Sequence, residues 1–397
     1  MERRDFLKRS VFASGMALVP SFLKGMEFLD PQQLSGYKNV IIIQLSGGND
    51  GLNTIIPVGN DIYYRLRPGI GKNKDATIRI QDDLAFNSHL KELAMLHDQG
   101  ELCIINNVGY PNPNRSHFRS SDIWHTASGA NEYLNTGWIG RYLDANCQHP
   151  YQAIEVDKGL SLTLKGEKMK GIAVDNPGLL YNTTREPFFK NVVTNTDTVL
   201  LNEDNQGYLY KTMLETYSSA AYIQETSKIY QTKMEYPKSG FAKKLKTIAD
   251  FIVSGLDTRV YYSALGGFDS HVNQVASQDR LLEIYSKGIA ALVADLKKND
   301  KFKDTLILTF SEFGRRVKQN ASGGTDHGTA NNVFLIGGNL NKAGVYNETP
   351  NLSTLDSNGD LIHTVDFRSI YATILHNWLG VDANSLLNGS FDRLNFI

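Results

Sequence analysis

The run Val40-Ile41-Ile42-Ile43-Gln44-Leu45 continues directly into Ser46-Gly47-Gly48-Asn49-Asp50. An almost uninterrupted apolar run of this length is typical of a strand that is buried on both faces of a parallel sheet. The glycines and the acidic residue after it indicate a loop at the carboxyl end of that strand. Because ligands of open α/β sheets bind outside the carboxyl ends of the strands, Asp50 becomes a candidate site residue.

Two later apolar runs repeat this pattern of a strand followed by polar residues. Residues 260–265 lead into Gly266-Gly267-Phe268-Asp269-Ser270-His271, and residues 305–310 lead into Ser311-Glu312-Phe313-Gly314-Arg315. The segment Gly324-Thr325-Asp326-His327-Gly328 follows soon afterwards. If the three strands are parallel neighbours, their acidic and imidazole side chains converge at one edge of the sheet, where they would form a metal site. The predicted metal ligands are Asp50, Asp269, His271, Glu312 and His327.

Helical spacing of apolar residues separates these strands. Residues 273–298 form the longest predicted helix, placed as a crossover between the second and third acid-bearing strands. A helix is also expected over 84–99 with Ser88 as its N-cap, and a strand over 102–108. The alternation predicts an α/β fold, a three-layer α/β/α doubly wound structure with a mostly parallel sheet.

Residues 150–205 differ in character from the rest of the chain. They are polar and contain the alternating stretch Ser161-Leu162-Thr163-Leu164 without a long helix. We interpret them as an inserted, partly antiparallel segment or lid within one domain that spans 31–397.

The N-terminus predicts export. Arg3-Arg4-x-Phe6-Leu7-Lys8 resembles a twin-arginine signal, although Glu2 replaces the usual Ser or Thr before the arginine pair. The apolar stretch 11–23 is too short for a membrane-spanning helix, so no transmembrane segment is expected in the mature protein. Residues 1–30 are therefore predicted to be an export signal that directs the protein to the periplasm or cell envelope. The alternative is an ordinary amphipathic N-terminal helix.

Composition excludes few functions but argues against one class of partner. The 397 residues carry a formal net charge of -1, so there is no electrostatic reason to expect nucleic acid as a partner. The two cysteines, Cys103 and Cys147, show no zinc-finger spacing. An oxidising compartment would permit a disulfide between them, but nothing in the sequence indicates one.

Each predicted ligand also has a structural explanation. Asp50 could cap backbone amides in a glycine turn, and Asp269 could cap the helix that follows it. Asp269 and His271 are separated by one residue, so in extended backbone both side chains would reach the same ion. Glu312 could pair with one of the arginines that follow it.

Two further residues are candidates for catalysis. Ser116 precedes a predicted helix, and a hydroxyl at a helix N-terminus lies in a positive potential that suits attack on a phosphate or sulfate. The alternative is that Ser116 only caps this helix. Arg315 could hold the anionic group of a substrate in a bidentate manner.

The order of these motifs resembles that of an exported bacterial family, the domain of unknown function numbered fifteen-oh-one. The motifs concerned also include Arg115-Ser116-His117-Phe118 and Asp366-Phe367-Arg368-Ser369-Ile370-Tyr371. This family is similar to the alkaline phosphatase and sulfatase superfamily, and the resemblance implies an alkaline-phosphatase-like fold. It also implies that Asp50 and Glu312 hold one metal, Asp269, His271 and His327 hold the other, and Ser116 is the nucleophile.

Two departures from the superfamily pattern affect this expectation. Phe313 stands where the superfamily has a metal-binding histidine, so the site of Asp50 and Glu312 loses a nitrogen donor. That site would then be weaker, would prefer a harder ion such as Mg²⁺, Mn²⁺ or Ca²⁺ over Zn²⁺, or would be empty. The sulfatase Cys-x-Pro-Ser-Arg motif is also missing.

The sequence thus predicts an exported metal-dependent hydrolase of phosphate or sulfate esters. Its cofactor would be a divalent metal (Zn, Mn, Mg or Ca), its substrate an anionic ester or glycan, and its export partner the twin-arginine machinery. Ser116 or a metal-bound water would attack the ester. The alternative is a non-catalytic exported metal-binding protein of the cell envelope. A Ser-His-Asp esterase is disfavoured because no G-x-S-x-G elbow occurs after a strand.

Overall fold

The structure is a computed structural model that describes residues 38–195 and 205–397. Lys38–Ile397 forms one compact unit. The predicted export signal at residues 1–30 lies outside the described residues. Within the described ranges, no helix combines the length and the apolar character that a membrane crossing requires.

The core of this unit is a mixed sheet with the strand order β11-β5-β10-β9-β1-β8-β6-β7, and β12 pairs with β5 at one end. All described neighbours in this sheet pair in parallel except at β10, which is antiparallel to both β5 and β9. The strands are β1 (Asn39–Ser46), β5 (Leu102–Gly109), β6 (Ala153–Glu155), β7 (Ile172–Ala173), β8 (Val260–Gly266), β9 (Thr305–Phe310), β10 (Asn331–Gly337), β11 (Gly344–Val345) and β12 (Val365–Asp366).

Strand β1 lies at the centre of the parallel region. Its residues alternate between two hydrophobic cores, with Ile41 and Ile43 on one face of the sheet and Val40 and Ile42 on the other. Burial on both faces explains why the run is almost wholly apolar. Strands β8 and β9 flank β1 in parallel. The expectation that the three acid-bearing strands are parallel neighbours is therefore confirmed.

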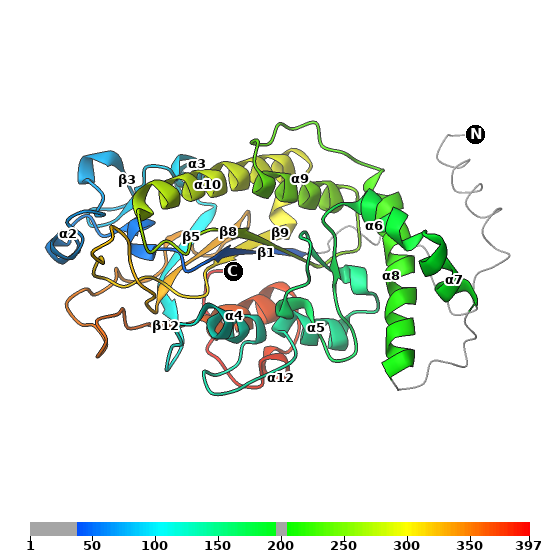
Figure 1. Cartoon of the computed structure of the whole chain (residues 1–397). Coiled ribbons are helices and arrows are strands. Elements are labelled where there is room, and N and C mark those ends of the chain that lie inside the picture. Colours follow the sequence, from blue (N-terminus) through cyan, green and yellow to red (C-terminus); the bar gives the residue numbers. More distant parts are fainter. Residues whose placement is uncertain (1–37, 196–204) are drawn as a thin grey trace. The chain divides into compact units, whose positions relative to one another are not determined.

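Helices cover both faces of the sheet (Figure 1). One core lies beneath α3 (Lys91–Asp98), α9 (Gly240–Val253) and α10 (Gln274–Lys298). The other core includes side chains of α4, α5, α11 and α12. These four helices are α4 (His117–Thr126), α5 (Trp138–Asn146), α11 (Phe367–Thr373) and α12 (Ala383–Leu387). The predicted three-layer α/β/α fold with a mostly parallel sheet is confirmed.

The predicted helix over 84–99 is wrong in its first half. Ala85–Asn87 forms β4, the middle strand of a small separate sheet, and α3 begins only after Leu90. Ser88 is therefore not the N-cap of α3. Pairing of β4 with two other strands outweighs the helical spacing of its apolar residues. The partner strands are β2 (Ile55–Ile56) and β3 (Thr77–Arg79).

In the described part of the segment 150–205, antiparallel pairing is limited to an isolated bridge between Lys165 and Lys170. The strands β6 and β7 of this segment extend the main sheet in parallel beyond β8, so these residues continue the central fold. Leu162–Leu164, predicted to be β-like, is a 3-10 turn, η5. The role of this segment as a lid stays a prediction. The segment also contains the helices α6 (Pro177–Thr184) and α7 (Pro187–Asn195), and α8 (Asn205–Ser227) begins at its end.

The remaining described elements are short helical turns and one helix, α2. They are α2 (Asp61–Leu66), η2 (Gly51–Asn53), η3 (Lys74–Ala76), η4 (Pro150–Gln152), η7 (Phe302–Asp304) and the π-helical turn η8 (Ile374–Trp378). The last of these directly continues α11, so two kinds of helix follow one another near the C-terminus.

Candidate metal centre

The loops that follow β1, β8 and β9 meet at the carboxyl edge of the sheet. The backbone N–H of Gly47 donates to Glu312 Oε1 at 2.7 Å, and the N–H of Phe268 donates to the Ser46 carbonyl at 3.2 Å. Gly47 has a φ of +116°, and a Cβ added to it would lie 2.3 Å from the backbone nitrogen of Asp269. Only glycine permits this approach, so the Gly-Gly sequence after β1 allows the three loops to pack together.

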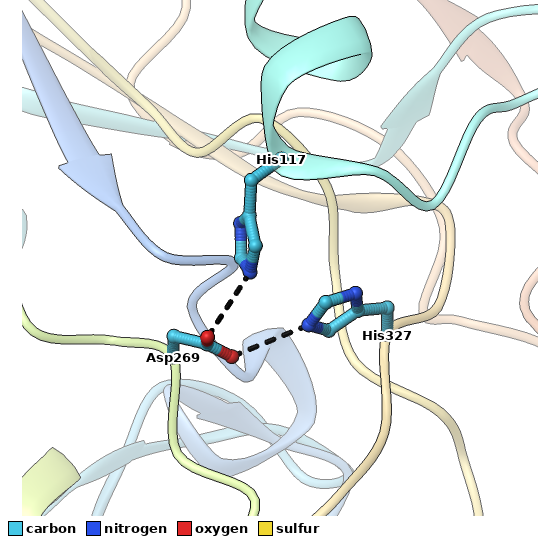
Figure 2. Close-up of side chains that lie close together, drawn as sticks. All are labelled: His117, Asp269 and His327. Atoms are coloured by element: carbon cyan, nitrogen blue, oxygen red, sulfur yellow. Dashed lines mark hydrogen bonds and ion pairs between the residues drawn. The ribbon is translucent and has the colours of Figure 1, made fainter.

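Three side chains from distant parts of the chain meet at this edge: His117, Asp269 and His327 (Figure 2). One ligand atom from each lies within 4.8 Å of the others. His117 Nε2 is 3.3 Å from Asp269 Oδ2, and His327 Nε2 is 3.2 Å from Asp269 Oδ1. Two imidazole nitrogens and a carboxylate therefore face one another across a small space.

His271 contacts two members of this cluster but lies outside the group of three whose ligand atoms are all within 4.8 Å of one another. Its Nε2 lies 3.0 Å from Asp269 Oδ1 and 3.0 Å from His327 Nε2. Ligand atoms bound tetrahedrally to Zn²⁺ at about 2.0–2.1 Å are about 3.3 Å apart, so these separations fit the edges of a zinc coordination shell. Two neutral imidazole nitrogens this close also need a proton or a cation between them. The donor set thus suits a divalent metal.

The other ring nitrogen of each histidine is held by an oxygen. His327 Nδ1 donates to the Arg115 carbonyl at 2.8 Å, and His117 Nδ1 lies 2.9 Å from Glu312 Oε1. His271 Nδ1 lies 3.4 Å from Asp326 Oδ1. A carbonyl or carboxylate on Nδ1 fixes the tautomer that leaves the Nε2 lone pair free, as is usual for histidines that bind metal. All three Nε2 atoms face Asp269.

The electrostatic environment keeps Asp269 and His327 in the protonation states that bind a metal. Burial tends to raise the pKa of Asp269, but its contacts with Arg315 and His327 and the charges of Arg315 and His117 hold this pKa well below its usual range. Burial lowers the pKa of His327. The hydrogen bond with Glu312 raises the pKa of His117. At neutral pH Asp269 is therefore ionised and His327 neutral, the forms that bind metal.

Glu312, a predicted ligand, lies behind the centre. Its side chain is 1% exposed and accepts hydrogen bonds from the Gly47 N–H at 2.7 Å and from Gln44 Nε2 at 3.3 Å. Its contact with His117 Nδ1 orients that imidazole toward Asp269. The geometry supports Glu312 as the carboxylate that positions His117.

One oxygen of Asp50 is occupied by protein partners, and the other, Oδ1, is buried without a hydrogen-bond partner among the described residues. Its Oδ2 accepts from Arg67 Nη1 at 2.6 Å and from Gln274 Nε2 at 2.5 Å, and its side chain is 1% exposed. Its side chain does not cap the η2 turn that follows it. Among the described residues, the group of clustered ligand atoms includes neither Asp50 nor Glu312.

Arg315, predicted to hold an anionic substrate, is buried and donates to the protein instead. Its Nη2 donates to Asp269 Oδ1 at 2.8 Å, and its Nε donates to the Gly48 carbonyl at 2.7 Å. Its other acceptors are the carbonyls of Gly47, Phe268 and Thr325. This geometry supports a role in holding Asp269 and leaves little of the guanidinium for a ligand.

Ser116 lies at the N-terminus of α4, immediately before His117. The Ser116 side chain is exposed and makes no capping hydrogen bond to the helix. The capping alternative is thus not what the structure shows, and the hydroxyl stays a candidate nucleophile by position alone.

The sequence pattern assigns no role to His117, although the structure places it in the cluster. The sequence does contain one feature that could have indicated a role for His117. This residue directly follows Ser116, the candidate nucleophile at the start of the helix. The Phe313 ring, which stands in the place expected for a histidine ligand, packs instead against His117 and His327, each with ring centroids 4.8 Å away. The histidine expected after β9 is absent, and α4 contributes His117 to the cluster instead.

Comparisons with known proteins identify one family. A family model described as "Protein of unknown function (DUF1501)" matches residues 182–395, which is more than half of the chain. The sequence of the chain matches no curated protein.

Several solved structures are similar to this chain at low identity. A sulfatase, PsFucS1, from Pseudoalteromonas sp. is 12% identical with a TM-score of 0.42, over 92% of this chain and 72% of that chain. The lipoteichoic acid synthase LtaP from Listeria monocytogenes is 9% identical with a TM-score of 0.36, over 78% and 67%. The C-terminal periplasmic domain of EcEptC from Escherichia coli, in complex with Zn, is 11% identical with a TM-score of 0.36, over 76% and 73%.

Proposed function

The chain belongs to the DUF1501 family of proteins of unknown function, and we propose that it is a metal-dependent hydrolase of phosphate or sulfate esters. One observation carries this proposal. His117 and His327 direct Nε2 at the carboxylate of Asp269, and each has its Nδ1 held by an oxygen. The cluster lies at the carboxyl edge of the parallel strands, where α/β proteins bind their ligands.

The metal would be held by His117, Asp269 and His327, with His271 as a fourth donor. Imidazole donors favour Zn²⁺ over Ca²⁺ and Mg²⁺, and the carboxylate of Asp269 would also accept Mn²⁺. A divalent cation in this position would polarise the ester and stabilise the negative charge that develops during its cleavage. Glu312 and Arg315 would keep His117 and Asp269 in the geometry that holds the ion.

Ser116 and the start of α4 would act on the ester itself. Because the Ser116 side chain makes no capping hydrogen bond, the first-turn amides of α4 are left to bind the oxygens of a phosphate or sulfate. The Ser116 hydroxyl would lose its proton to solvent and attack the phosphorus or sulfur atom, the bond to the ester alcohol would break and the alcohol would leave with a proton from solvent, and water would then hydrolyse the esterified serine. The substrate class would be an anionic ester, including one carried by a glycan.

We expect the purified protein to hydrolyse p-nitrophenyl phosphate or p-nitrophenyl sulfate. Activity should be lost with a chelator and restored by Zn²⁺ or Mn²⁺. Ser116→Ala should lower kcat by about 10³-fold because it removes the attacking oxygen. Ser121→Ala, on the same helix, is the matched control and should change kcat little. Release of p-nitrophenol is the measurement.

Failure of this experiment would favour the second candidate, a non-catalytic exported metal-binding protein of the cell envelope. Two observations support that alternative: Arg315 is taken up by protein acceptors, and Asp50 is paired with Arg67. In that case the metal-loaded protein would hydrolyse no ester in a broad panel. Substitution of His327 would then lower thermal stability without any activity to lose.

We also propose export to the periplasm or cell envelope by the twin-arginine machinery, on the basis of Arg3-Arg4-x-Phe6-Leu7-Lys8. In a bacterium with this machinery, a double variant with Arg3→Lys and Arg4→Lys should accumulate in the cytoplasm. Arg9→Lys, outside the motif, should be exported normally. Cell fractionation and immunoblotting measure the distribution, and identical fractionation of both variants would rule out this route.

A further inference from the structure

Asp360 is a completely buried carboxylate that carries no role in the site described above. Its side chain is 0% exposed, and its Oδ2 accepts from both Nε and Nη2 of Arg115, the Nε contact being 2.8 Å. Its Oδ1 lies 3.8 Å from Nε of a second arginine, Arg316. A buried carboxylate therefore lies between two guanidinium groups.

A tight turn fixes the direction of this carboxylate. Asp356 Oδ1 accepts from the backbone N–H groups of Asn358 and Asp360, both at 2.8 Å. Gly359 in the same turn has a φ of +80°, which glycine adopts without strain. Asp356 Oδ2 adds a second contact with Arg115 Nη2, at 3.2 Å. The loop is thus a rigid acceptor for the arginine.

Both arginines belong to segments that carry residues of the centre. The carbonyl of Arg115 accepts the hydrogen bond from His327 Nδ1, and His117 lies two residues further along the chain. Arg316 directly follows Arg315, which binds Asp269, and its N–H donates to the Asp326 carbonyl at 3.0 Å. Asp360 therefore connects to the centre through hydrogen bonds with Arg115 and, by a longer charge contact, through Arg316.

We propose that Asp360 is a positioning residue for this centre. By anchoring the Arg115 side chain it fixes the carbonyl that sets the tautomer and ring orientation of His327. It also fixes the point from which the chain turns into α4 and His117. The inference rests on the proposed metal centre, and it places the control of that centre in a loop that contributes no ligand.

The test compares Zn²⁺ affinity in the folded, full-length protein. Asp360→Asn removes the charge that holds Arg115, and we expect Zn²⁺ to bind about 10–100-fold more weakly. Competition with a chromophoric chelator measures the affinity, and near-UV circular dichroism checks the fold. In the Co²⁺-loaded protein, the visible absorption bands should shift, because the ring of His327 changes orientation.

Asp366→Asn is the matched control. Asp366 holds Arg368 through the same two donors, Nε at 2.9 Å and Nη2 at 2.6 Å, without a link to the centre. We expect its Zn²⁺ affinity and Co²⁺ spectrum to equal those of the unaltered protein. A loss of affinity equal to that of Asp360→Asn would overturn the inference, because it would show a general response to a broken ion pair.

Arg115→Lys is the second variant. It keeps a cation beside Asp360 but loses the two-donor contact. If Asp360→Asn does not fold, this variant therefore tests whether that contact positions the metal centre. Weaker Zn²⁺ binding in this variant supports the inference. If Arg115→Lys binds Zn²⁺ within twofold of the unaltered protein, and Asp360→Asn does so too where it folds, the inference is overturned. The proposed function would not be affected by that result. If the unaltered protein binds no Zn²⁺, the proposed function fails and this inference fails with it.

Discussion

Replacing His327 with alanine is expected to weaken Zn²⁺ binding by about two to three orders of magnitude, because the binding free energy of a four-ligand zinc site, about 10–16 kcal/mol, is shared among its ligands. His327 has the largest expected effect of the histidines. Its Nε2 lies beside both Asp269 Oδ1 and His271 Nε2, and its Nδ1 is held by a carbonyl. Chelator competition and elemental analysis of the purified protein measure the result.

His376→Ala is the control for this prediction. His376 is exposed on the η8 turn, and its loss should leave Zn²⁺ affinity unchanged. If the two variants retain the same metal content and the same affinity, the cluster around Asp269 does not hold the metal. The centre would then have to be sought elsewhere in the chain.

The second large effect concerns Arg67 and Asp50. Arg67→Met should lower the free energy of unfolding by about 3–5 kcal/mol, because it leaves a buried carboxylate without its counter-charge. The side chains of the two residues are 0% and 1% exposed, and their charged atoms are 2.6 Å apart. Urea denaturation measures the change. Arg65→Met, on the exposed side of α2, should cost little.

A double variant separates the two roles considered for Asp50. If Asp50 serves to balance Arg67, adding Asp50→Asn to Arg67→Met should restore part of the lost stability, since no unpaired charge remains. If Asp50 instead binds a metal, Arg67→Met should be mild and a chelator should destabilise the unaltered protein by a similar amount. The contacts with Arg67 and Gln274 favour the first result.

Much of the fold follows from the sequence because its decisive signals are local. A central parallel strand must be apolar on both faces, and β1 has this pattern in six consecutive residues with one exception, Gln44. Parallel strands then carry their following loops to the same edge. This rule alone predicts that Asp269, His271 and His327 lie close together, and the structure places them in contact.

The parts that could not be predicted depend on pairing between distant residues. Whether Glu312 binds a metal or orients a histidine depends on His117, which is 195 residues away in the chain. Asp50 looks like a free ligand until Arg67 is placed against it by α2. Arg315 likewise appears available in sequence and is buried among carbonyls in the fold. A sequence pattern reports residue type but not which partner has already occupied a side chain.

The wide separation of the clustered side chains in the chain has a thermodynamic consequence. Asp269 and His327 are 58 residues apart, and His117, the first residue of α4, precedes Asp269 by 152 residues. In an extended polypeptide only Asp269 and His271 are close enough in sequence to share an ion, so a cation would bind the native state much more tightly than the unfolded chain. By mass action, each tenfold rise in free cation above its dissociation constant would then favour the native state by a further ~1.4 kcal/mol. The concentration of free metal around the protein would therefore help to set its free energy of unfolding.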